Sequence, residues 1–533
     1  MRRWNGWGDD SIESSLPPRA LELLEALVGP GTPPHDATLA SVVDAVPTSR
    51  LIADPRLDCD PVARVRHARG HSLPDWVALR SGRLGAVPDA VASPSDAAAV
   101  AELLALGSRT GAALLPYGGG TSVVGGVTVR PSDRPVITVD LGDAAGLRAL
   151  DETSRLATFG AGTTGPALEV ALASRGLTLG HYPQSFETST VGGWVVTRSA
   201  GQQSRGYGRI EALFAGGHLE TPRGPIDLAP YPASAAGPDL REAVLGSEGR
   251  LGILTDVIVR ASAKPKQERF NAYLLPDWDR ALEFARRLAQ SGLPVSMARV
   301  STPLETATTF TLAGDGRATR LLGRYLGLRG MGPERCLAIV GLTGQPSVVG
   351  ATSRAVDDLV RGARGIAGPG IGPAWRKQRF TAPYLRNALW DAGYAVDTLE
   401  TATDWTTLPD LAAALGRTLR HGLDPGGERV HAFSHLSHGY PTGSSLYSTY
   451  LFRLAPDPDE TLDRWRTLKT AASDVIRAHG ATISHQHGVG LDHAPYLPAE
   501  KGPLGMEAIG ALVRTFDPDG RMAHGALLGD GDP

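Results

Sequence analysis

The chain of 533 residues has only two cysteines, Cys59 and Cys336, and their spacing does not match a metal-binding motif. This scarcity excludes a cysteine-based metal site and fits a reducing compartment. Long apolar runs are also missing, because none approaches the ~20 residues that a helix needs to cross a bilayer. The first residues contain no apolar signal-peptide region. We therefore expect a cytoplasmic protein without a transmembrane segment.

An excess of charge of one sign is missing as well. The 53 Lys and Arg residues nearly balance the 56 Asp and Glu residues, which leaves a net charge of −3. This balance removes the electrostatic argument for a nucleic-acid partner or an anionic membrane. The 42% hydrophobic and 20% charged fractions are those of a globular protein. The length predicts two or three packed units.

Glycine is abundant, and three stretches combine it with small polar residues. The first stretch, residues 116–122, contains three consecutive glycines followed by Thr121 and Ser122. Such a run can turn successive backbone N–H groups toward an anion such as a pyrophosphate. It is not a P-loop, because Gly-Lys-Ser/Thr does not follow, and it is not a Rossmann turn, because an apolar strand, Val123–Val129, is predicted next. A hairpin turn unusually rich in glycine is the alternative.

The second stretch, residues 184–200, alternates hydroxylated residues with glycine and is almost free of charge. The third stretch, residues 248–254, has regularly spaced glycines and one acid, Glu248. Both patterns suit a backbone that lies directly against a large ligand and offers it N–H groups and hydroxyls. A Ser/Thr-rich surface loop is the alternative for the second stretch.

A further glycine pattern, Gly160-Ala-Gly162-Thr-Thr-Gly165, fits the dinucleotide-binding fingerprint after a predicted strand. The strand predicted beyond the following helix ends in His181, where the fingerprint requires an acidic residue for the ribose. No repeated βαβ alternation surrounds the pattern. We interpret it as a tight strand-to-helix turn.

In this order, the three stretches resemble the FAD-binding domain of the p-cresol methylhydroxylase/vanillyl-alcohol oxidase superfamily. The resemblance implies an α+β fold, in which FAD lies between two small subdomains and an α+β cap domain covers the flavin. The first stretch would take the pyrophosphate, and the other two the isoalloxazine and ribityl groups. Because the first stretch has no histidine, non-covalent FAD is expected. The residues expected to bind it are Pro116, Tyr117, Gly118, Gly119, Gly120, Thr121 and Ser122, then Gln184, Ser185, Phe186, Glu187, Thr188, Ser189, Thr190, Thr197, Arg198, Ser199 and Ala200, and finally Glu248, Gly249, Arg250, Leu251, Gly252, Ile253 and Leu254.

Changes of pattern along the chain predict four segments. Residues 1–88 form an N-terminal helical extension, and residues 89–262 the FAD-binding domain. Residues 263–504 form the cap or substrate domain, and residues 505–533 return to the FAD-binding domain. In the cap segment, predicted strands and amphipathic helices alternate, which favours a sheet with helices on one face.

The cap segment contains two groups of histidines, His431, His435 and His438 in one and His485 and His487 in the other. Their spacings could supply metal ligands, but no Cys, Asp or Glu within either group completes a ligand set. We therefore predict no metal. Histidines satisfied by packing and histidines that act as acids or bases above the flavin both remain open.

Longer motifs resemble alkyldihydroxyacetonephosphate synthase over nearly the whole chain. They are Trp4-Asn-Gly-Trp-Gly8, His181-Tyr-Pro-Gln-Ser-Phe-Glu187, Pro383-Tyr-Leu-Arg386, Thr398-Leu-Glu-Thr401, Ser437-His-Gly-Tyr-Pro441, Leu446-Tyr447 and Ser484-His-Gln-His-Gly488. That family exchanges the acyl group of acyl-dihydroxyacetone phosphate for a fatty alcohol, through a flavin N5 adduct and without net redox change. We expect the same type of reaction here, with a small-molecule or lipid-like substrate, a homodimer and peripheral membrane contact.

The resemblance also implies a set of catalytic residues, namely Tyr447, His485, His487, Arg386, Arg299 and His181. Tyr447 would transfer a proton, and the two later histidines would be active-site bases. Arg386 would bind the anionic head of the substrate, a task that suits a guanidinium fork. His181 matches a histidine next to the flavin. Structural ion pairs for the arginines and a buried core phenol for the tyrosine are the alternatives.

One departure concerns Gln486, which stands where animal members of the family have the middle one of three histidines. An amide does not exchange a proton as imidazole does, so one catalytic function is missing or relocated. The alternative function is an FAD-linked oxidase or dehydrogenase of a hydroxy acid or another alcohol. Those enzymes carry His-x-Gly-Asp-Gly-Asn-x-His and Glu-His-Gly motifs, and this chain has no Asp-Gly-Asn after His435 and no Glu at the position of Gln486. A flavin-binding protein without catalysis is a third possibility.

Overall fold

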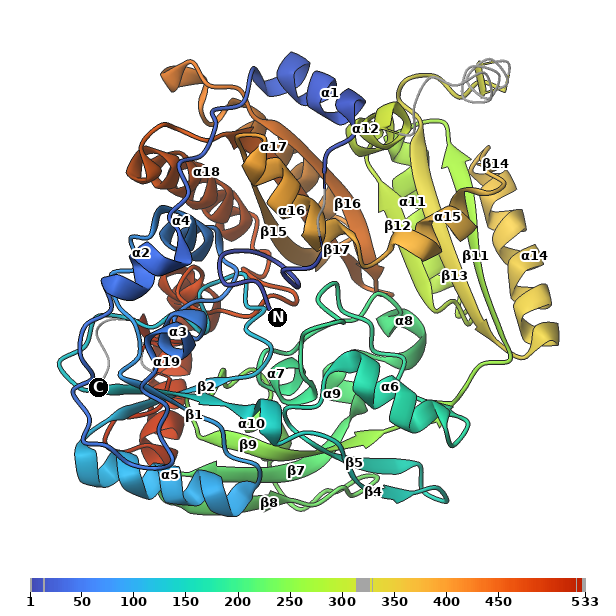
Figure 1. Ribbon diagram of the computed structural model, residues 1–533. Coiled ribbons are helices and arrows are strands. Elements are labelled where there is room, and N and C mark those ends of the chain that lie inside the picture. Colours follow the sequence, from blue (N-terminus) through green and yellow to red (C-terminus); the bar gives the residue numbers. More distant parts are fainter. Residues whose placement is uncertain (1, 13–14, 313–325, 328, 524, 530–533) are drawn as a thin grey trace.

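The computed structural model describes residues 2–12, 15–312, 326–327, 329–523 and 525–529. Its strands form two groups of sheets, which lie in the lower and upper parts of Figure 1. The lower part contains a three-stranded and a five-stranded sheet, and the upper part contains a seven-stranded sheet. The fold is therefore of the mixed α+β class, as the sequence predicts.

The N-terminal segment consists of short helices, each stabilised by a proline at its start or by a capping side chain. The helices are α1 (Pro18–Val28), α2 (Leu39–Asp44), α3 (Pro61–Arg66) and α4 (Leu73–Ser81). Helix α1 buries Leu24 and Val28 against Tyr394 and Leu451 of the seven-stranded sheet. The N-terminal segment thus lacks a large core of its own and packs on the cap, as expected from its sequence.

The three-stranded sheet is parallel, in the order β1 (Ala90–Ala92), β3 (Val136–Asp140), β2 (Ala113–Tyr117). Helix α5 (Ala97–Thr110) begins after the capping side chain of Asp96 and ends at Gly111 in the left-handed conformation. Its apolar stripe contributes to the same core as these strands. This arrangement leaves the carboxyl end of β2, where the first stretch begins, free to turn toward a ligand.

The five-stranded sheet is antiparallel, in the order β4 (Leu147–Asp151), β5 (Leu156–Gly160), β9 (Ile253–Arg260), β7 (Phe214–Thr221), β8 (Gly224–Leu228). Burial alternates along β9, so that Val257 and Val259 face the core. The shorter elements between these strands are η1 (Leu141–Asp143), α6 (Gly165–Ala173), β6 (Leu177–Thr178), α7 (Val191–Val196), α8 (Ser204–Tyr207), α9 (Ile210–Leu213), α10 (Arg241–Val244) and β10 (Ser262–Ala263).

The strand predicted over Val123–Val129 is absent, and turns take its place. Gly125 has a left-handed backbone and lies against Leu491, whose backbone N–H donates to the carbonyl oxygen of Val124 at 2.8 Å. Val124 is therefore buried by another loop, and Val129 packs with Leu115 and Val136, so neither valine is buried by strand pairing of its own. The pattern Gly160–Gly165 does form a strand-to-helix turn between β5 and α6.

The seven-stranded sheet of the cap has the order β14 (Ile366–Ala367), β11 (Gln267–Leu275), β13 (Cys336–Gly344), β12 (Met297–Ser301), β16 (His431–Gly439), β17 (Gly443–Arg453), β15 (Tyr394–Asp404). Its helices are α11 (Trp278–Gln290), α12 (Pro303–Leu312), α14 (Pro346–Gly362), α15 (Ile371–Gln378), α16 (Ala382–Asp391), α17 (Leu408–His421) and α18 (Pro458–Ala478), with η2 at Asp424–Gly426.

Helices cover both faces of this sheet, so the expectation of helices on one face is wrong. Helices α11, α14, α17 and α18 share the core to which Tyr273 and Leu275 of β11 belong. The alternate residue Leu274 faces the opposite side, where α12 and α15 contribute Phe310 and Trp375 to a smaller core. Because successive side chains of a strand point to opposite faces, these contacts place helices on each side.

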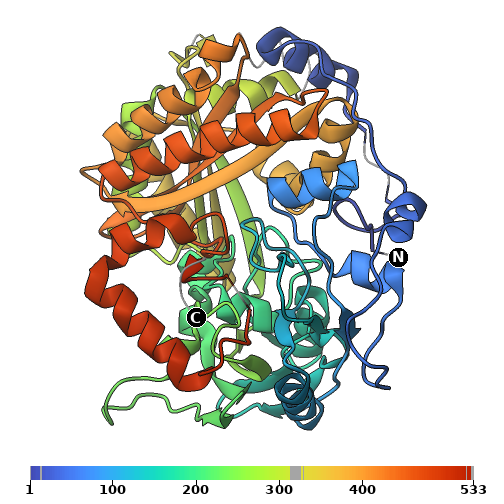
Figure 2. The ribbon, with the colours of Figure 1, turned by 90° about the vertical axis from the view of Figure 1, so that its left-hand side faces the viewer.

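The chain returns to the lower part through η3 (Ala494–Tyr496) and α19 (Leu497–Phe516), which is interrupted at Gly502. Figure 2 shows α19 in red running down one side of the molecule. Beyond it, Met522 forms a parallel β-bridge with Leu114 of β2. The guanidinium of Arg250 donates to the carbonyl oxygen of Met522 at 2.6 Å. The C-terminal segment therefore holds both the first and the third glycine-rich stretches.

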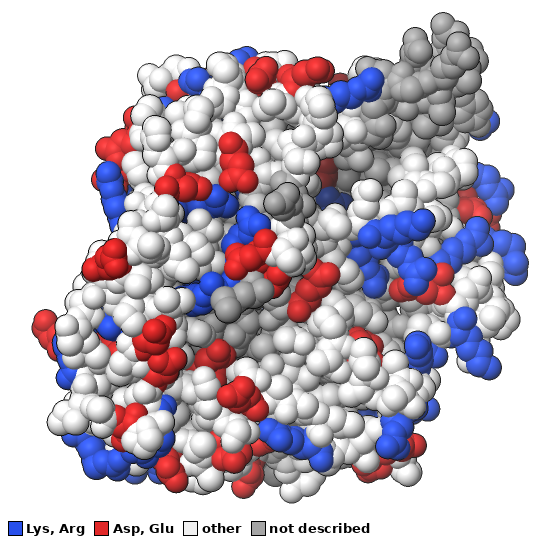
Figure 3. Space-filling view, viewed as in Figure 1, with Lys and Arg blue, Asp and Glu red and all other residues white. Residues whose placement is uncertain are grey.

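Both signs of charge are interspersed on the face shown in Figure 3, and basic side chains gather near its right-hand edge. That edge carries α14 and α15 of the cap (Figure 1), whose exposed basic residues include Arg354, Arg361, Arg376 and Lys377. None of the described helices combines the length and the apolar character needed to cross a membrane.

Candidate active site

The three glycine-rich stretches meet in one place. A side chain on Gly118 would collide with Thr190 Oγ1, and one on Gly119 with the carbonyl oxygen of Thr188. A Cβ on Gly249 would lie 3.0 Å from Pro116 Cγ, and Gly249 also has a left-handed backbone. The first stretch is thus packed against the second and the third with no room for side chains.

The first stretch has the free donors that an anion requires. Within the described residues, the backbone N–H groups of Gly119, Gly120 and Thr121 donate no hydrogen bond to a protein acceptor. Backbone N–H groups left without acceptors are costly unless a ligand or water takes them. A turn that presents several of them together can hold a phosphate. The stretch therefore fits the pyrophosphate of FAD.

The second stretch forms the start of α7. Thr190 caps the helix by accepting from the backbone N–H of Gly193 at 3.3 Å, and Ser189 Oγ accepts from Trp194 Nε1 at 2.7 Å. His181 lies beside this helix, with its ring centroid 4.8 Å from that of Trp194 and its Nε2 atom 3.2 Å from Ser199 Oγ. Its Nδ1 atom is buried without a hydrogen-bond partner among the described residues. Burial lowers the pKa of His181 to about 3, so the ring is neutral.

The third stretch joins the lower part to the cap through Glu248. This residue is buried, and its carboxylate accepts hydrogen bonds from the backbone N–H groups of Val489 and, at 2.8 Å, Gly490. Burial raises the pKa of Glu248 to about 7, although these two N–H groups act in the opposite direction. Residues 484–493 therefore rest on the FAD-binding half and at the same time carry the second group of histidines.

Several side chains expected at the cofactor have protein partners. Gln184 donates to the carbonyl oxygen of Arg379 at 3.1 Å, and Glu187 accepts from the hydroxyl of Tyr384 at 2.7 Å. Arg198 pairs with Glu242 at 2.6 Å. The hydroxyl of Tyr117 accepts from Arg2 at 2.5 Å. The side chains of these residues are therefore held by other parts of the protein.

The carboxylate of Glu400 is the centre of the cap side of the site. Glu400 is 1% exposed, and its Oε1 atom accepts from the backbone N–H groups of His485, Gln486 and His487 at 2.9, 2.6 and 2.9 Å. Burial raises its pKa, but the two histidines and the N–H groups outweigh burial and hold it well below the usual range. Glu400 is therefore a carboxylate that fixes the loop of the two histidines. The side-chain oxygen of Gln486 is buried without a partner among the described residues.

Tyr447 lies opposite both Glu400 of β15 and His435 of β16 in the antiparallel sheet. Its ring stacks on that of His435 at 5.1 Å and meets the ring of His487 edge to face at 5.5 Å. Burial raises the pKa of Tyr447 to about 12. Burial also lowers the pKa of His487, whereas Glu400 raises it. The structure thus brings together a phenol that stays protonated and a histidine that stays neutral.

His485 is held by groups from both halves of the molecule. Its Nε2 atom lies 2.7 Å from Nη1 of Arg209 and 2.6 Å from the hydroxyl of Tyr440. Its Nδ1 atom lies 3.4 Å from Oε2 of Glu400. The ring of His438 lies 4.9 Å away, and Nε2 of His438 bonds to the carbonyl oxygen of Gly201 at 3.0 Å. Histidines of the two predicted groups therefore lie in contact with each other. Both belong to the cap, and His438 also contacts the FAD-binding half through Gly201.

The two predicted arginines differ in their surroundings. Arg386 donates to the carbonyl oxygen of His71 at 2.5 Å and lies 4.4 Å over the ring of Trp76, but its Nε and Nη2 atoms are buried without partners among the described residues. Burial lowers its pKa to about 10. Arg299 instead pairs with Glu305 at 2.5 Å, and Oε1 of this carboxylate also lies 3.2 Å from Nδ1 of His435. Arg299 is thus already neutralised, whereas Arg386 has donors available.

Sequence reasoning missed Glu400, Glu305 and Arg209 as site residues. Glu400 lies within the quoted motif Thr398–Thr401, and an acid in an otherwise apolar and hydroxylated strand was the available signal. Arg209 and Glu305 carry no local signal, because their partners lie 276 and 130 residues away in the chain, at His485 and His435. Among the described residues, no three His, Cys, Asp or Glu side chains are grouped so that they could hold a metal ion.

Sequence models of two protein families match the chain in tandem. The FAD binding domain matches residues 88–226, and the C-terminal domain of FAD linked oxidases matches residues 264–527. The first match contains the first two glycine-rich stretches, and the second contains both groups of histidines. FAD is therefore the cofactor, in agreement with the free N–H groups of the first stretch.

Curated relatives and solved structures point to a narrower group. The alkyldihydroxyacetonephosphate synthase of Dictyostelium discoideum is 28% identical over 97% of this chain and 91% of the relative. A solved structure of alkyldihydroxyacetonephosphate synthase superimposes with a TM-score of 0.83 at 25% identity, covering 98% of each chain. The structure of p-cresol methylhydroxylase with substrate bound shares the fold, with a TM-score of 0.66 at 14% identity over 96% of each chain.

Proposed function

Because this chain is an FAD-dependent flavoenzyme similar to alkyldihydroxyacetonephosphate synthase, we propose that it exchanges an acyl for an alkyl group on a dihydroxyacetone phosphate-type substrate. The observation that carries this proposal is the state of Arg386. Two of its N–H-bearing atoms are buried without partners among the described residues, and Tyr447 is among the groups that influence its pKa. A guanidinium with free donors beside an acid–base pair suits a substrate with an anionic head.

The chain's own residues would bind the substrate and move protons. When bound, FAD supplies the isoalloxazine ring at which the reacting carbon of the substrate is activated. Tyr447 remains protonated at neutral pH, so its hydroxyl can donate. Glu400, 3.9 Å from Nδ1 of His487, favours the proton on that nitrogen and leaves Nε2 of His487 as the acceptor. His181, held neutral beside α7, offers its free Nδ1 to the flavin side of the site.

The experiment that tests this function mixes the purified holoenzyme anaerobically with candidate substrates while the flavin absorbance is followed. Turnover of an acyl-dihydroxyacetone phosphate and a fatty alcohol to the ether product, without lasting bleaching, supports the transferase. Full bleaching by a hydroxy acid, with no transfer to the alcohol, would instead establish the FAD-linked oxidase or dehydrogenase.

We propose the same four segments as the working division of the chain, 1–88, 89–262, 263–504 and 505–533. The separate sheets of the lower and upper parts support the boundary near residue 262.

We also propose a cytoplasmic location, which the two free cysteines support. Peripheral membrane contact would use the basic edge of the cap seen in Figure 3. A homodimer and non-covalent FAD complete the proposal.

A further inference from the structure

Arg209 lies at the boundary between the FAD-binding half and the cap, in the segment between α8 and α9. Its side chain is 16% exposed. Three of its nitrogen atoms are directed to different groups. Nε donates to Glu211 at 2.6 Å, Nη2 donates to the carbonyl oxygen of Arg198 at 3.0 Å, and Nη1 lies 2.7 Å from Nε2 of His485. Arg209 is thus fixed from its own half and contacts two side chains of the cap, His485 at 2.7 Å and, through a longer hydrogen bond from Nη1, the hydroxyl of Tyr440 at 3.4 Å.

The contact with His485 determines where the histidine carries its proton. A guanidinium has five N–H donors and no acceptor, so a nitrogen at hydrogen-bond distance from it must offer a lone pair. Nε2 of His485 is therefore unprotonated. In the neutral ring the proton then lies on Nδ1, which faces Oε2 of Glu400 at 3.4 Å. Protonation of Nε2 would break this contact and place two cations side by side.

The groups around His485 agree with this assignment. Glu400 faces it from β15, His438 from β16, Tyr440 from the turn after β16, and Arg209 from the FAD-binding half. Burial lowers the pKa of His438 to about 3, so that ring adds no charge. Glu211 is directed to Nε of Arg209 and does not contact the histidine. The nearest positive charge to Nε2 is therefore the guanidinium of Arg209, which faces this nitrogen directly.

We propose that Arg209 is a positioning residue that holds His485 as the neutral Nδ1–H tautomer, so that His487 alone exchanges protons with the substrate. This inference rests on the proposed function for the role of His487, but the tautomer of His485 does not depend on it. His485 then serves as a fixed link between Glu400 and the FAD-binding half.

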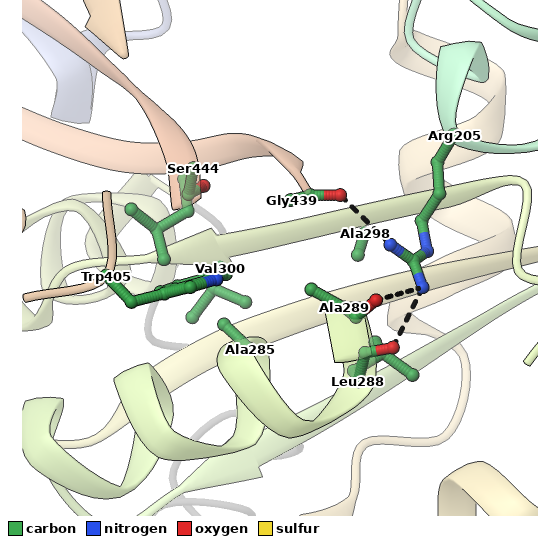
Figure 4. Close-up of a pocket in the computed structure, with 10 residues that line it drawn as sticks. Arg205, Ala285, Leu288, Ala289, Ala298, Val300, Trp405, Gly439 and Ser444 are labelled. Carbon is green, nitrogen blue, oxygen red and sulfur yellow. Dashed lines mark hydrogen bonds between the residues drawn. The ribbon is translucent and has the colours of Figure 1, made fainter. Parts of the chain in front are cut away.

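Arg205 provides a matched control, because it joins the same two halves without touching a histidine. It donates to the carbonyl oxygens of Gly439 at 2.9 Å and of Leu288 at 2.8 Å, at the end of helix α11 (Figure 4). The small cavity that it lines with apolar residues such as Trp405 has a volume of about 10 Å³, enough for at most one water molecule. Arg205→Gln therefore weakens the contact between the halves but leaves the active site intact.

The test labels the histidines of the holoenzyme with ¹⁵N and assigns the ring signals of His485 by their loss in His485→Asn. At pH 8 the parent and Arg205→Gln are expected to show a ring that carries its proton on Nδ1. Arg209→Gln is expected to shift the ring toward the Nε2–H tautomer, because Nε2 can then donate to the hydroxyl oxygen of Tyr440, and Arg209→Lys, which retains a cationic donor, is expected to resemble the parent. Tyr440→Phe should leave the tautomer unchanged, because Arg209 remains.

The kinetic counterpart is the pH profile of kcat/KM. In Arg209→Gln, kcat/KM is expected to fall about 10-fold and its pH profile to differ in shape from that of the parent, whereas Arg205→Gln should keep the parent's profile. The proposal is overturned if the His485 ring of the parent carries its proton on Nε2 at pH 8. It is also overturned if the Arg209→Gln and Arg205→Gln proteins have the same ring signals. Because these signals require no substrate, they decide the proposal even if the proposed reaction proves wrong.

Discussion

Glu400 and Tyr447 are direct cross-strand partners in the antiparallel ladder of β15 and β17. The pairing places a buried carboxylate and a buried phenol next to each other, and the loop of His485 and His487 closes over both. Sheet geometry, which is more rigid than loop geometry, therefore sets the relative positions of the proton-transferring groups.

Tyr447→Phe should keep the fold and the flavin but lose turnover. Only a hydroxyl is removed, so the structural cost should be within about 1–2 kcal/mol. The chemical step should slow by roughly 10²–10⁴-fold, the usual contribution of a positioned acid or base. Flavin absorbance and ether-product formation are the measurements. Tyr273→Phe, which removes another buried phenol, one that donates to Asp357 on β11's side of the sheet, is the control and should turn over normally. Equal turnover of both variants would make Tyr447 a core phenol.

The acid limb of the pH profile should lie below the ordinary histidine range. His487 must be neutral to accept a proton, and burial lowers its pKa from 6.5. Activity should therefore persist below pH 6.5 and fall only as the lowered pKa is crossed. No alkaline loss from Tyr447 is expected below about pH 12. A parent profile that is half-lost at pH 6.5 or above would contradict this assignment.

Acid should destabilise the protein through its buried neutral histidines. The pKa values of His181, His438 and His493 are each lowered by burial to about 3, against 6.5 for an ordinary histidine. The unfolded chain binds more protons than the folded one between these values, so stability is complete above pH 6.5 and is lost as the pH falls toward 3. Each histidine should remove about 1.4 kcal/mol of unfolding free energy between pH 7.5 and 5.5.

Denaturant unfolding at the two pH values measures this effect. His493→Gln removes one buried titrating group and should reduce the pH dependence, whereas the exposed His35→Gln should not change it. An identical pH dependence in the two variants would mean that His493 is protonated in the folded state.

Gly119→Ala should weaken FAD binding strongly. Its Cβ would collide with the carbonyl oxygen of Thr188, so the first and second stretches would have to separate. Gly426→Ala is the matched control, because no heavy atom lies within 4 Å of its added Cβ. Fluorescence titration of the apoprotein with FAD should show an affinity at least about 10-fold lower for Gly119→Ala only. Unchanged affinity would place the pyrophosphate elsewhere.

FAD should be released intact when the protein is denatured, because the first stretch has no histidine to which it could be bonded. Precipitation with acid followed by centrifugation separates the two outcomes. Yellow colour in the supernatant is expected. Colour retained in the pellet would show a covalent bond and would make another residue its attachment point.

The elements that sequence periodicity predicts best are those whose burial follows one face. The apolar stripe of Leu411, Leu415 and Leu419 predicts a helix over residues 408–421, and helix α17 has these bounds. The strand Val123–Val129 was predicted for the same apolar character and is wrong. There, the loop around Leu491 covers Val124, and Val129 packs with Leu115 and Val136, without strand pairing by either valine. Local pattern cannot distinguish these two modes of burial.

The candidate site shows the same limit. Motif resemblance found Tyr447 and His487, and the structure brings them together. It also placed Arg299 among the catalytic residues, and the structure pairs that residue with Glu305. Whether a charged side chain is free or already neutralised depends on partners far away in the chain. Only the folded arrangement shows this.

The pairing of Met522 with Leu114 has a consequence for biosynthesis. The strand that leads into the pyrophosphate-binding stretch is synthesised early, but Arg521 and Ala523 complete its hydrogen bonds only about 400 residues later. At a translation rate of roughly 5–20 residues per second, the nascent chain waits on the order of tens of seconds for these partners. A chain that stalls before them still exposes the edge of β2 and lacks the support that Met522 gives to Arg250. Loading of the flavin should therefore follow the synthesis of residues 521–523.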